Sequence, residues 1–248
     1  MMKKKLVLTI LFGCIISTGY GQQLSADEIL EKVEKNLSSD NRIFESSMTI
    51  QGSRTSRTIT SKTYSAGTKQ AFTEYLSPAR EQGTKMLKLE KQLWIYSPST
   101  DRTIQISGHM MRQSVMGSDL SYEDMMDDRK LTDTYSAKIS GNEVINGRKT
   151  FILDLSAKVS DVTYSSRRMW IDAERFVPLK EELYAKSGQL LKRTELSDIR
   201  HTEGRWFPFT VIYKDMLKQG SGTEFKITSI KFNLEIPDHI FTKAALKQ

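Results

Sequence analysis

Four carboxylates lie close together in the middle of the chain, and they come nearest to the pattern of a catalytic or cation-binding site. They are Glu123, Asp124, Asp127 and Asp128. Such a group could act in acid–base catalysis or bind Ca²⁺. However, the spacing of an EF-hand loop is absent, and carboxylates are also favoured in the first turn of a helix because they oppose its dipole. We therefore predict a short helix here, capped by Ser121 or Asp119, and no metal site.

The three histidines do not indicate a metal or catalytic site. His109, His201 and His239 are far apart in the sequence and lack the H-x-x-x-H spacing of zinc ligands. The chain also contains no G-x-S-x-G motif, no glycine-rich phosphate loop and no H-E-x-x-H motif. We therefore predict no catalytic residue, no metal ligand and no cofactor.

Methionine is unusually concentrated in the same region as the carboxylates. The chain has 11 methionines, and five of them occur within 17 residues, at Met110, Met111, Met116, Met125 and Met126. Methionine is flexible and polarisable, so it suits irregular gaps in a core as well as surfaces that bind varied apolar partners. Gly108 and Gly117 would allow the segment to hinge. The segment is either a loop whose methionines fill a core or a flap over a binding hollow, and we favour the flap.

Several motifs along the chain carry a resemblance to one family. They are residues 93–96 (LWIY) followed by Pro98, the pair Met111-Arg112, residues 117–124 (GSDLSYED), residues 169–172 (MWID), residues 190–193 (LLKR) and residues 236–242 (IPDHIFT). The octapeptide resembles the GSDF-S/T-YED signature of outer-membrane lipoprotein-sorting proteins. From about residue 25 to 246, the chain resembles this family, whose members have the fold of the LolA-like periplasmic carriers.

The resemblance implies a mainly β fold of the α+β class, a half-open antiparallel β-barrel of about ten or eleven strands covered by a few helices. It also implies a non-enzymatic carrier that binds acyl chains of lipoproteins or lipids in an apolar cavity, works with a membrane transporter or receptor, and is a monomer. A periplasmic sensor of the same fold would bind the same ligands, and the sequence does not separate the two. A hydrolase is a third alternative, but it would need a nucleophile, a base and oxyanion donors that we do not find.

The binding residues are expected in the central region of the chain. Those expected to line the cavity or the flap are Trp94, Tyr96, Met110, Met111, Met116, Tyr122, Met125 and Met126. The three aromatic residues among them could equally fill a core, because aromatic side chains dominate cores. Arg112 could pair with Asp119 or Asp124 and thereby fix the methionine segment against the sheet, which is a structural role.

One amphipathic helix and a short terminal element are predicted at the two ends of the folded region. Residues 24–37 begin with Ser25 and Glu28 in the spacing of a capping box, and their apolar stripe consists of Ile29, Leu30, Val33 and Leu37. The resemblance places this helix over the barrel. Residues 237–246 are expected to form a turn or short helix that packs against the body through Ile240, Phe241 and Leu246.

Strand patterns alternate with turn signals through the rest of the chain. Extended segments are predicted over residues 44–50, 55–64, 70–76, 85–89, 93–96, 103–106, 149–157, 162–172, 177–184, 189–200, 206–217 and 224–234. The strongest turn signal is Asn146-Gly147, because both residues tolerate the positive φ of a two-residue hairpin turn. Consecutive strands joined by tight turns predict an antiparallel meander. Residues 55–64 are rich in Ser and Thr, so we expect that strand at an edge or solvated on both faces.

The first residues have the pattern of a secretory signal peptide. Three lysines at positions 3–5 precede an apolar run over residues 6–16, and Gly19-Tyr20-Gly21 supplies a small-x-small cleavage site. We expect a signal peptide of residues 1–21, a single domain of residues 22–248 and a periplasmic location. Residues 11–14 (LFGC) loosely resemble a lipobox, so lipid anchoring through Cys14 is the alternative.

The composition is that of a folded domain with an excess of positive charge. Charged residues make up 27% and apolar residues 38% of the chain, which argues against disorder. The formal net charge is +7 for the whole chain and +4 without residues 1–21, and this modest positive balance suits an approach to anionic membrane surfaces. Nucleic acid is not a predicted partner, because the chain has no arginine-rich helix and no aromatic-basic platform.

Overall fold

The computed structural model describes residues 24–52, 55–127 and 129–248, and the expected signal peptide, with Cys14 and Gly21, lies outside them. In the described ranges the protein is mainly β. Its strands are β1 Asn41–Gln51, β2 Ser56–Ala66, β3 Gln70–Ser77, β4 Lys85–Leu89, β5 Gln92–Ser97, β6 Arg102–Ile106, β7 Tyr135–Ile145, β8 Arg148–Ala157, β9 Ser166–Asp172, β10 Pro178–Tyr184, β11 Leu190–Thr202, β12 Arg205–Asp215 and β13 Thr223–Phe232.

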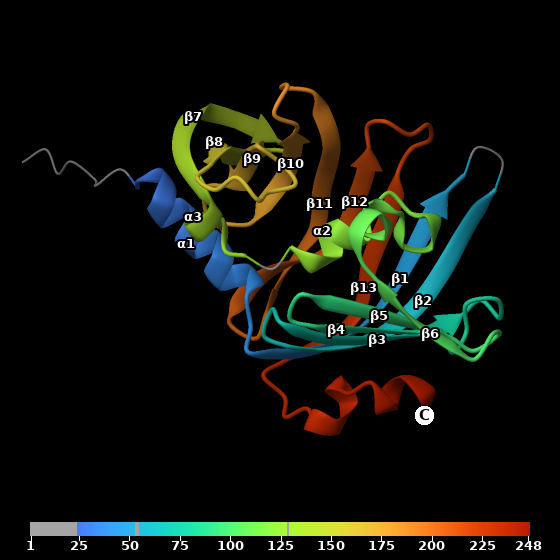
Figure 1. Ribbon diagram of the computed structural model, residues 1–248. Coiled ribbons are helices and arrows are strands. Elements are labelled where there is room, and N and C mark those ends of the chain that lie inside the picture. The colour runs from blue at the N-terminus through green and yellow to red at the C-terminus, as the bar shows by residue number, and fades with distance from the viewer. Residues whose placement is uncertain (1–23, 53–54, 128) are drawn as a thin grey trace, which may run out of the picture.

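These 13 strands form one antiparallel sheet in the order β6-β5-β4-β3-β2-β1-β13-β12-β11-β10-β9-β8-β7. Neighbours in the sheet are neighbours in the chain, with one exception, the pairing of β1 with β13. The sheet therefore consists of two meanders, β1–β6 and β7–β13, joined along β1 and β13. It curves strongly, but its edge strands β6 and β7 lie far apart, so it is not a closed barrel (Figure 1).

Tight turns follow the sequence signals at the hairpins. Asn146 and Gly147 have φ of 49° and 76° between β7 and β8, and Glu203 and Gly204 have φ of 45° and 79° between β11 and β12. Positive φ at both central residues gives a turn whose twist matches that of the flanking strands. The predicted meander is therefore confirmed.

The predicted number of ten or eleven strands is too low. The segment that forms β7 was not predicted as a strand, because it has few large apolar residues and its pairing with β8 is interrupted by a bulge between Ile139 and Gly141. Residues 55–64 were expected at an edge of the sheet or solvated on both faces, and this prediction is wrong. β2 pairs with β1 on one side and with β3 on the other, and its inward face is buried.

Helix α1 Ala26–Leu37 begins with the predicted capping box, in which Ser25 Oγ accepts a hydrogen bond from Glu28 N at 3.2 Å and Glu28 Oε2 accepts one from Ser25 N at 2.7 Å. Its buried face consists of Ala26, Ile29, Leu30 and Val33. This face packs against β7, β8 and β9 at one end of the sheet, where Leu153, Leu155 and Ile171 are fully buried (Figure 1). None of the helices in the described ranges is long and apolar enough to cross a membrane.

The C-terminal segment packs on the convex side of the first meander. Its two 3-10 helices, η3 Asp238–Phe241 and η4 Ala244–Lys247, bury Phe241, Ala245 and Leu246 against Phe72, Leu87 and Trp94. The Nζ atom of Lys243 lies 4.1 Å from the centroid of the Trp94 ring. The predicted packing of this segment on the body is confirmed.

The methionine-rich segment lies on the opposite, concave side of the sheet. It contains η1 Gly108–Arg112, η2 Val115–Gly117 and α2 Tyr122–Met126, and it leads to α3 Leu131–Thr134 beside α1. We call residues 107–127 the cover, because in Figure 1 they lie over the concave face of the sheet near β1, β2 and β4–β6.

Candidate functional site

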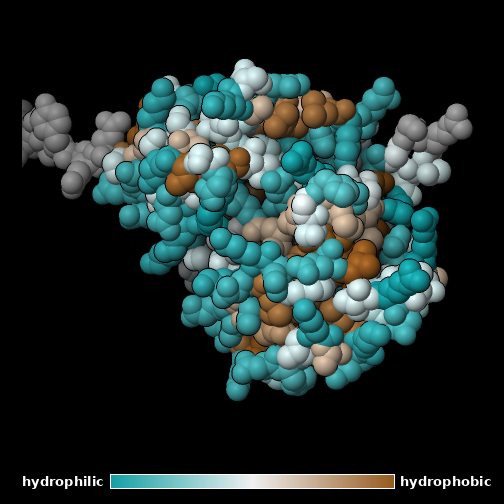
Figure 2. All heavy atoms as spheres, in the orientation of Figure 1, coloured by the Kyte–Doolittle hydropathy of each residue, from teal (hydrophilic) through white to brown (hydrophobic). Residues whose placement is uncertain are grey.

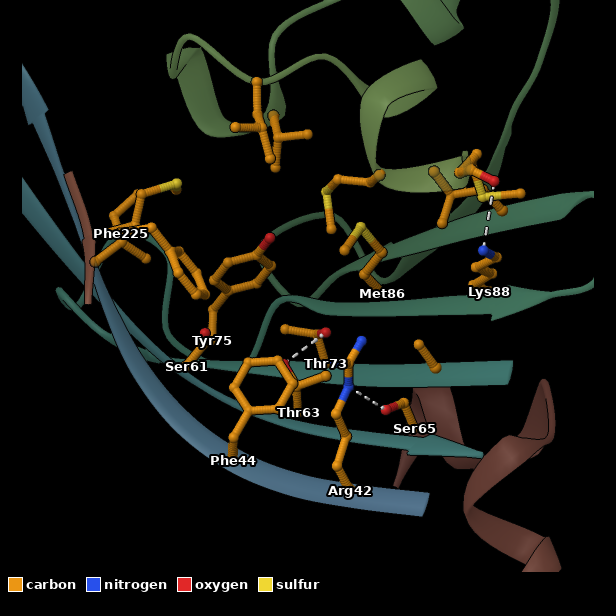
Figure 3. Close-up of a pocket in the computed structure, with 18 residues that line it drawn as sticks. Arg42, Phe44, Ser61, Thr63, Ser65, Thr73, Tyr75, Met86, Lys88 and Phe225 are labelled. Atoms are coloured by element: carbon orange, nitrogen blue, oxygen red, sulfur yellow. Dashed lines mark hydrogen bonds between the residues drawn. The ribbon is translucent and has the colours of Figure 1, made fainter. Parts of the chain in front are cut away.

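A hollow of about 210 Å³ lies between the cover and the concave face of the first meander. Its lining comes from five strands of that meander, from β13 and from the cover (Figure 3). The lining residues are Arg42, Phe44, Met48, Ile59, Ser61, Thr63, Ser65, Ala71, Thr73, Tyr75, Met86, Lys88, Leu93, Val115, Leu120, Met125, Met126 and Phe225.

The register of the strands arranges this lining in rows across the sheet. At one end, the aligned positions on β1 to β4 are Arg42, Ser65, Ala71 and Lys88. The next row is Phe44, Thr63, Thr73 and Met86. Toward the far end, Met48 is aligned with Ile59 on one side and with Phe225 on the other. The hollow is therefore cationic at one end and apolar at the other.

Hydroxyl groups in the middle rows satisfy one another across the strands. Ser46 Oγ and Ser61 Oγ are 3.1 Å apart, and Thr63 Oγ1 and Thr73 Oγ1 are 3.0 Å apart. A hydroxyl can be buried at little cost when it is hydrogen-bonded. These pairs explain why a Ser- and Thr-rich strand lies inside the sheet with its inward face covered.

The cover forms the roof of the hollow with half-buried methionines. Met125 and Met126 line the hollow directly, whereas Met116 packs against Met48, Ile59 and Tyr75 beneath it. Met110 and Met111 pack on the buried cluster of the cover and β4–β6, outside the lining of the hollow. Figure 2 shows apolar side chains gathered on the surface where the cover meets β4–β6.

The aromatic residues predicted for the cavity do not line it. Trp94 and Tyr96 of β5 belong to the cluster on the convex side, under the C-terminal segment. Leu93, the neighbour of Trp94 in β5, faces the hollow. Tyr122 is buried in the cover, and burial raises the pKa of its hydroxyl. These three aromatic residues therefore fill packed clusters, which is the alternative to lining the cavity that the sequence left open.

Helix α2 is fixed on its other side to the second meander. Ser121 and Asp124 form a capping box, with Ser121 Oγ accepting a hydrogen bond from Asp124 N at 3.1 Å. The Asp124 carboxylate also accepts hydrogen bonds from Lys192 Nζ at 2.7 Å and from Tyr164 Oη at 2.5 Å. Burial alone raises the pKa of Asp124, but Lys192, Tyr164 and Ser121 together hold it below its ordinary value.

A second ion pair joins the end of α2 to the same meander. Asp127 accepts a hydrogen bond from Arg167 at 2.8 Å, and Arg167 in turn contacts Glu181 at 3.2 Å. All five predicted methionines lie on the cover. Asp124 and Asp127 lie on it too, but their carboxylates point to β9–β11 and not to the hollow. Two of the four carboxylates that first suggested a chemical site, Asp124 and Asp127, therefore hold α2 in place. Asp128 lies outside the residues that the structure describes.

Asp119 fixes the middle of the cover to the sheet. It is 7% exposed, and its carboxylate accepts hydrogen bonds from Thr223 Oγ1 at 2.7 Å and from Asp215 N at 2.9 Å. Neither Asp119 nor Asp124 is joined to Arg112 by a hydrogen bond or ion pair in the part of the chain that the structure describes. Both carboxylates contact the sheet, but through Lys192, Tyr164, Thr223 and Asp215 and not through Arg112, the partner that the sequence suggested.

Replacing Asp119 with alanine is expected to lower the free energy of unfolding by about 1–3 kcal/mol, because two buried donors lose their acceptor. Urea denaturation of wild type and variant would measure this difference. Asp133→Ala, at an exposed position of α3, is the matched control and should leave the midpoint nearly unchanged. Equal midpoints for all three proteins would contradict the assignment.

The histidines are not brought together by the fold. His109 lies in η1, His239 lies in η3, and His201 packs edge-on against Trp206 with ring centroids 5.1 Å apart. Within the described ranges, no group of three or more His, Cys, Asp or Glu side chains could hold a metal ion.

Sequence reasoning missed the polar residues of the hollow, namely Arg42, Ser61, Thr63, Ser65, Thr73 and Lys88. The available signal was the alternation of Ser and Thr along residues 58–65, which places one set of hydroxyls on one face of a strand. Arg42 and Lys88 carried no signal of their own, because their neighbours across the sheet come from other strands.

Comparisons with known proteins agree with this architecture. A family model described as “uncharacterized protein” matches residues 67–248. The comparison with curated proteins gives no match. Among solved structures, an outer membrane lipoprotein-sorting protein domain from Vibrio parahaemolyticus is similar, with a TM-score of 0.78 and 23% sequence identity over 90% of this chain and 98% of that one.

Two further structures are similar over comparable lengths. A DUF1329 family protein from Desulfovibrio piger has a TM-score of 0.80 and 23% identity, covering 89% of this chain and 97% of that one. A LolA superfamily protein from Nitrosomonas europaea has a TM-score of 0.73 and 25% identity, covering 90% of this chain and 100% of that one. The chain belongs to the family whose model it matches, and its open antiparallel sheet with short covering helices is the fold of the LolA-like proteins.

Proposed function

We propose that this protein is a non-enzymatic carrier that shields acyl chains of lipoproteins or lipids in the hollow beneath the cover. The observation that carries the proposal is the hollow itself, an apolar space roofed by half-buried methionines that can adapt to a flexible chain. Burial of an acyl chain is favourable by about 0.8 kcal/mol for each CH₂ group. Proteins of this fold from other bacteria include one described as a lipoprotein-sorting domain, which supports the same class of ligand.

The size of the hollow requires the cover to move during binding. Its volume of about 210 Å³ is below the range of about 300–1,000 Å³ that is usual for ligand sites. An entering chain must therefore displace the roof. The roof residues that line the hollow are Val115, Leu120, Met125 and Met126. Gly108 and Gly117, with φ of 54° and 77°, lie at the ends of η1 and η2, where the cover can bend. The carrier would release its cargo when a membrane transporter or receptor in the periplasm offers better burial.

Lipid extraction and native mass spectrometry test this proposal. Protein purified from a bacterial host without delipidation is expected to carry acyl species, seen as mass increments and recovered in the organic extract. Delipidated protein should then bind a fluorescent fatty-acid probe. A protein that carries no acyl species and also fails to bind the probe would contradict the carrier function, and turnover of acyl esters would point to an enzyme.

A further inference from the structure

Arg42 is a half-buried cation whose guanidinium points into the hollow without a carboxylate partner in the described residues. Its Nε donates a hydrogen bond to Ser65 Oγ at 3.1 Å, and its guanidinium carbon lies 5.9 Å from the centroid of the Phe44 ring. Figure 3 shows the end of the guanidinium directed into the space between β1 and the cover. Its two terminal nitrogens make no hydrogen bond or ion pair with any residue that the structure describes.

The surroundings of Arg42 disfavour its charge. Burial lowers the pKa of Arg42, and the nearby Arg205 lowers it further, while Tyr213 acts in the opposite direction. Buried charges in proteins are normally paired, because an unpaired one loses its hydration without compensation. The same protein follows this rule elsewhere: buried Arg167 contacts the carboxylates of Asp127 and Glu181. Arg42 departs from this rule, and it faces an apolar hollow in which a ligand could lie.

The register places a second cation at the same end of the hollow. Lys88 on β4 is aligned with Ala71, which is aligned with Ser65 beside Arg42, so the two cations lie three strand spacings apart, or about 14 Å. The Nζ atom of Lys88 donates a hydrogen bond to Met126 O of the roof at 3.4 Å. Along β1, the six residues from Arg42 to the apolar end at Met48 span about 20 Å.

We propose that the hollow is specific for an amphiphile with an acyl chain and an anionic head group, with the head group bound by Arg42 and the chain extending toward Met48 and Ile59. This inference rests on the proposed carrier function and narrows it to a ligand that carries its own negative charge. A guanidinium binds carboxylate and phosphate through paired N–H donors, so a fatty acid and a lysophosphatidate share the required chemistry.

The test compares matched ligands that differ only in charge. Palmitate, 1-palmitoyl lysophosphatidate and the neutral methyl palmitate are titrated against delipidated protein by displacement of the neutral dye N-phenyl-1-naphthylamine. Wild type is expected to bind at least one of the two anions about tenfold or more tightly than the ester. The tighter of the two anions identifies whether a carboxylate or a phosphate is the preferred head group.

Arg42→Met should remove this preference by weakening the anions to the level of the ester, while the ester itself binds as before. Arg42→Lys keeps the charge but not the paired donors, so it should retain part of the preference for the anions. This variant replaces Arg42→Met in the test if the methionine variant does not fold. Arg200→Met, on the exposed face of β11 where Arg200 pairs with Asp198, is the matched control and should behave as wild type.

The outcomes separate the two proposals. If wild type binds the ester as tightly as both anions, and Arg42→Met changes none of the three affinities, the head-group inference is overturned while the carrier function stands. If wild type displaces no dye with any of the three ligands, the carrier function itself fails. Loss of affinity for the ester in Arg42→Met, with the fold intact, would also overturn the inference, because Arg42 would then act on the shape of the hollow.

Discussion

Replacing Ala71 with tryptophan is expected to weaken acyl-chain binding by 100-fold or more while leaving the protein folded. Ala71 is a small residue in the cationic row of the hollow, and its neighbours across β2 and β4 are Ser65 and Lys88. An indole ring placed there fills much of a hollow of about 210 Å³. Since each buried CH₂ group contributes about 0.8 kcal/mol, exclusion of even four such groups removes about 3 kcal/mol, or more than two orders of magnitude in affinity.

The measurement is a fluorescent fatty-acid titration beside a thermal melt. Leu76→Trp is the matched control, because it adds the same ring on the same strand at a position that is 40% exposed. The control should bind as wild type does. Unchanged binding in the Ala71 variant, with an unchanged melting temperature, would mean that the chain binds elsewhere.

Replacing Lys192 with methionine is expected to destabilise the protein more than any other single change at the cover. Lys192 Nζ donates hydrogen bonds to the Asp124 carboxylate and to Asp119 O, both at 2.7 Å, and both it and Asp124 are largely buried. Removal of one partner of a buried ion pair costs about 3–5 kcal/mol, because the other charge is left uncompensated. For a domain of this size the melting temperature should fall on the order of 10 °C.

Two controls separate the ion pair from general effects of the substitution. Lys149→Met, at an exposed position of β8, should leave the melting temperature within about 1–2 °C of wild type. Addition of Asp124→Asn to Lys192→Met should recover part of the loss, because no unpaired charge remains. If the double variant is as unstable as the sum of the two single variants, Asp124 and Lys192 are not coupled.

The same ion pair has a defined dependence on pH. The pKa of Asp124 is lower in the folded protein than in the unfolded chain, so its contribution to stability is fully present above the unfolded value of about 3.9. That contribution is lost as the pH falls through the lower, folded pKa. The difference in unfolding free energy between wild type and Asp124→Asn should therefore be constant above about pH 5 and shrink below pH 4. A difference that grows on acidification would contradict this sign.

Local signals in the sequence predicted the elements that depend on neighbouring residues. The capping box of α1 and the two-residue turn at Asn146-Gly147 need only residues within a few positions of one another, and both are confirmed. The C-terminal segment was predicted from its own apolar residues, Ile240, Phe241 and Leu246, although the residues against which it packs lie in distant strands. The LolA-like fold came from motifs spread along the chain and is likewise confirmed.

The side of the sheet that Trp94 faces could not be read from the sequence. β4 and β5 are covered by the roof of the hollow on one side and by the C-terminal segment on the other. A strand buried on both faces is apolar throughout and shows no alternation. The pattern of β5 therefore carries no information on which of Leu93 and Trp94 faces the hollow, and the prediction chose the larger side chain.

The hydrogen-bond partners of the polar residues could not be predicted from the sequence, because strand register determines them. Asp124 binds Lys192 and Tyr164, and the hydroxyl of Thr63 pairs with that of Thr73, which are contacts set by strand register. Nearby charge suggested Arg112 for Asp124, but proximity in sequence is a poor guide once a chain crosses a curved sheet. Burial of the Ser- and Thr-rich β2 follows from the same register.

The single pairing between strands distant in the chain, β1 with β13, sets the order in which the protein can fold. Every other strand pair is a hairpin between consecutive strands, so each meander can form from local contacts with a small loss of loop entropy. The pairing of β1 with β13 aligns Arg42 with Phe232 and Met48 with Phe225. Formation of this pair closes the longest loop of the sheet. Because Phe225 completes the apolar end of the hollow, we expect the hollow to form only with this contact, the one that costs the most loop entropy.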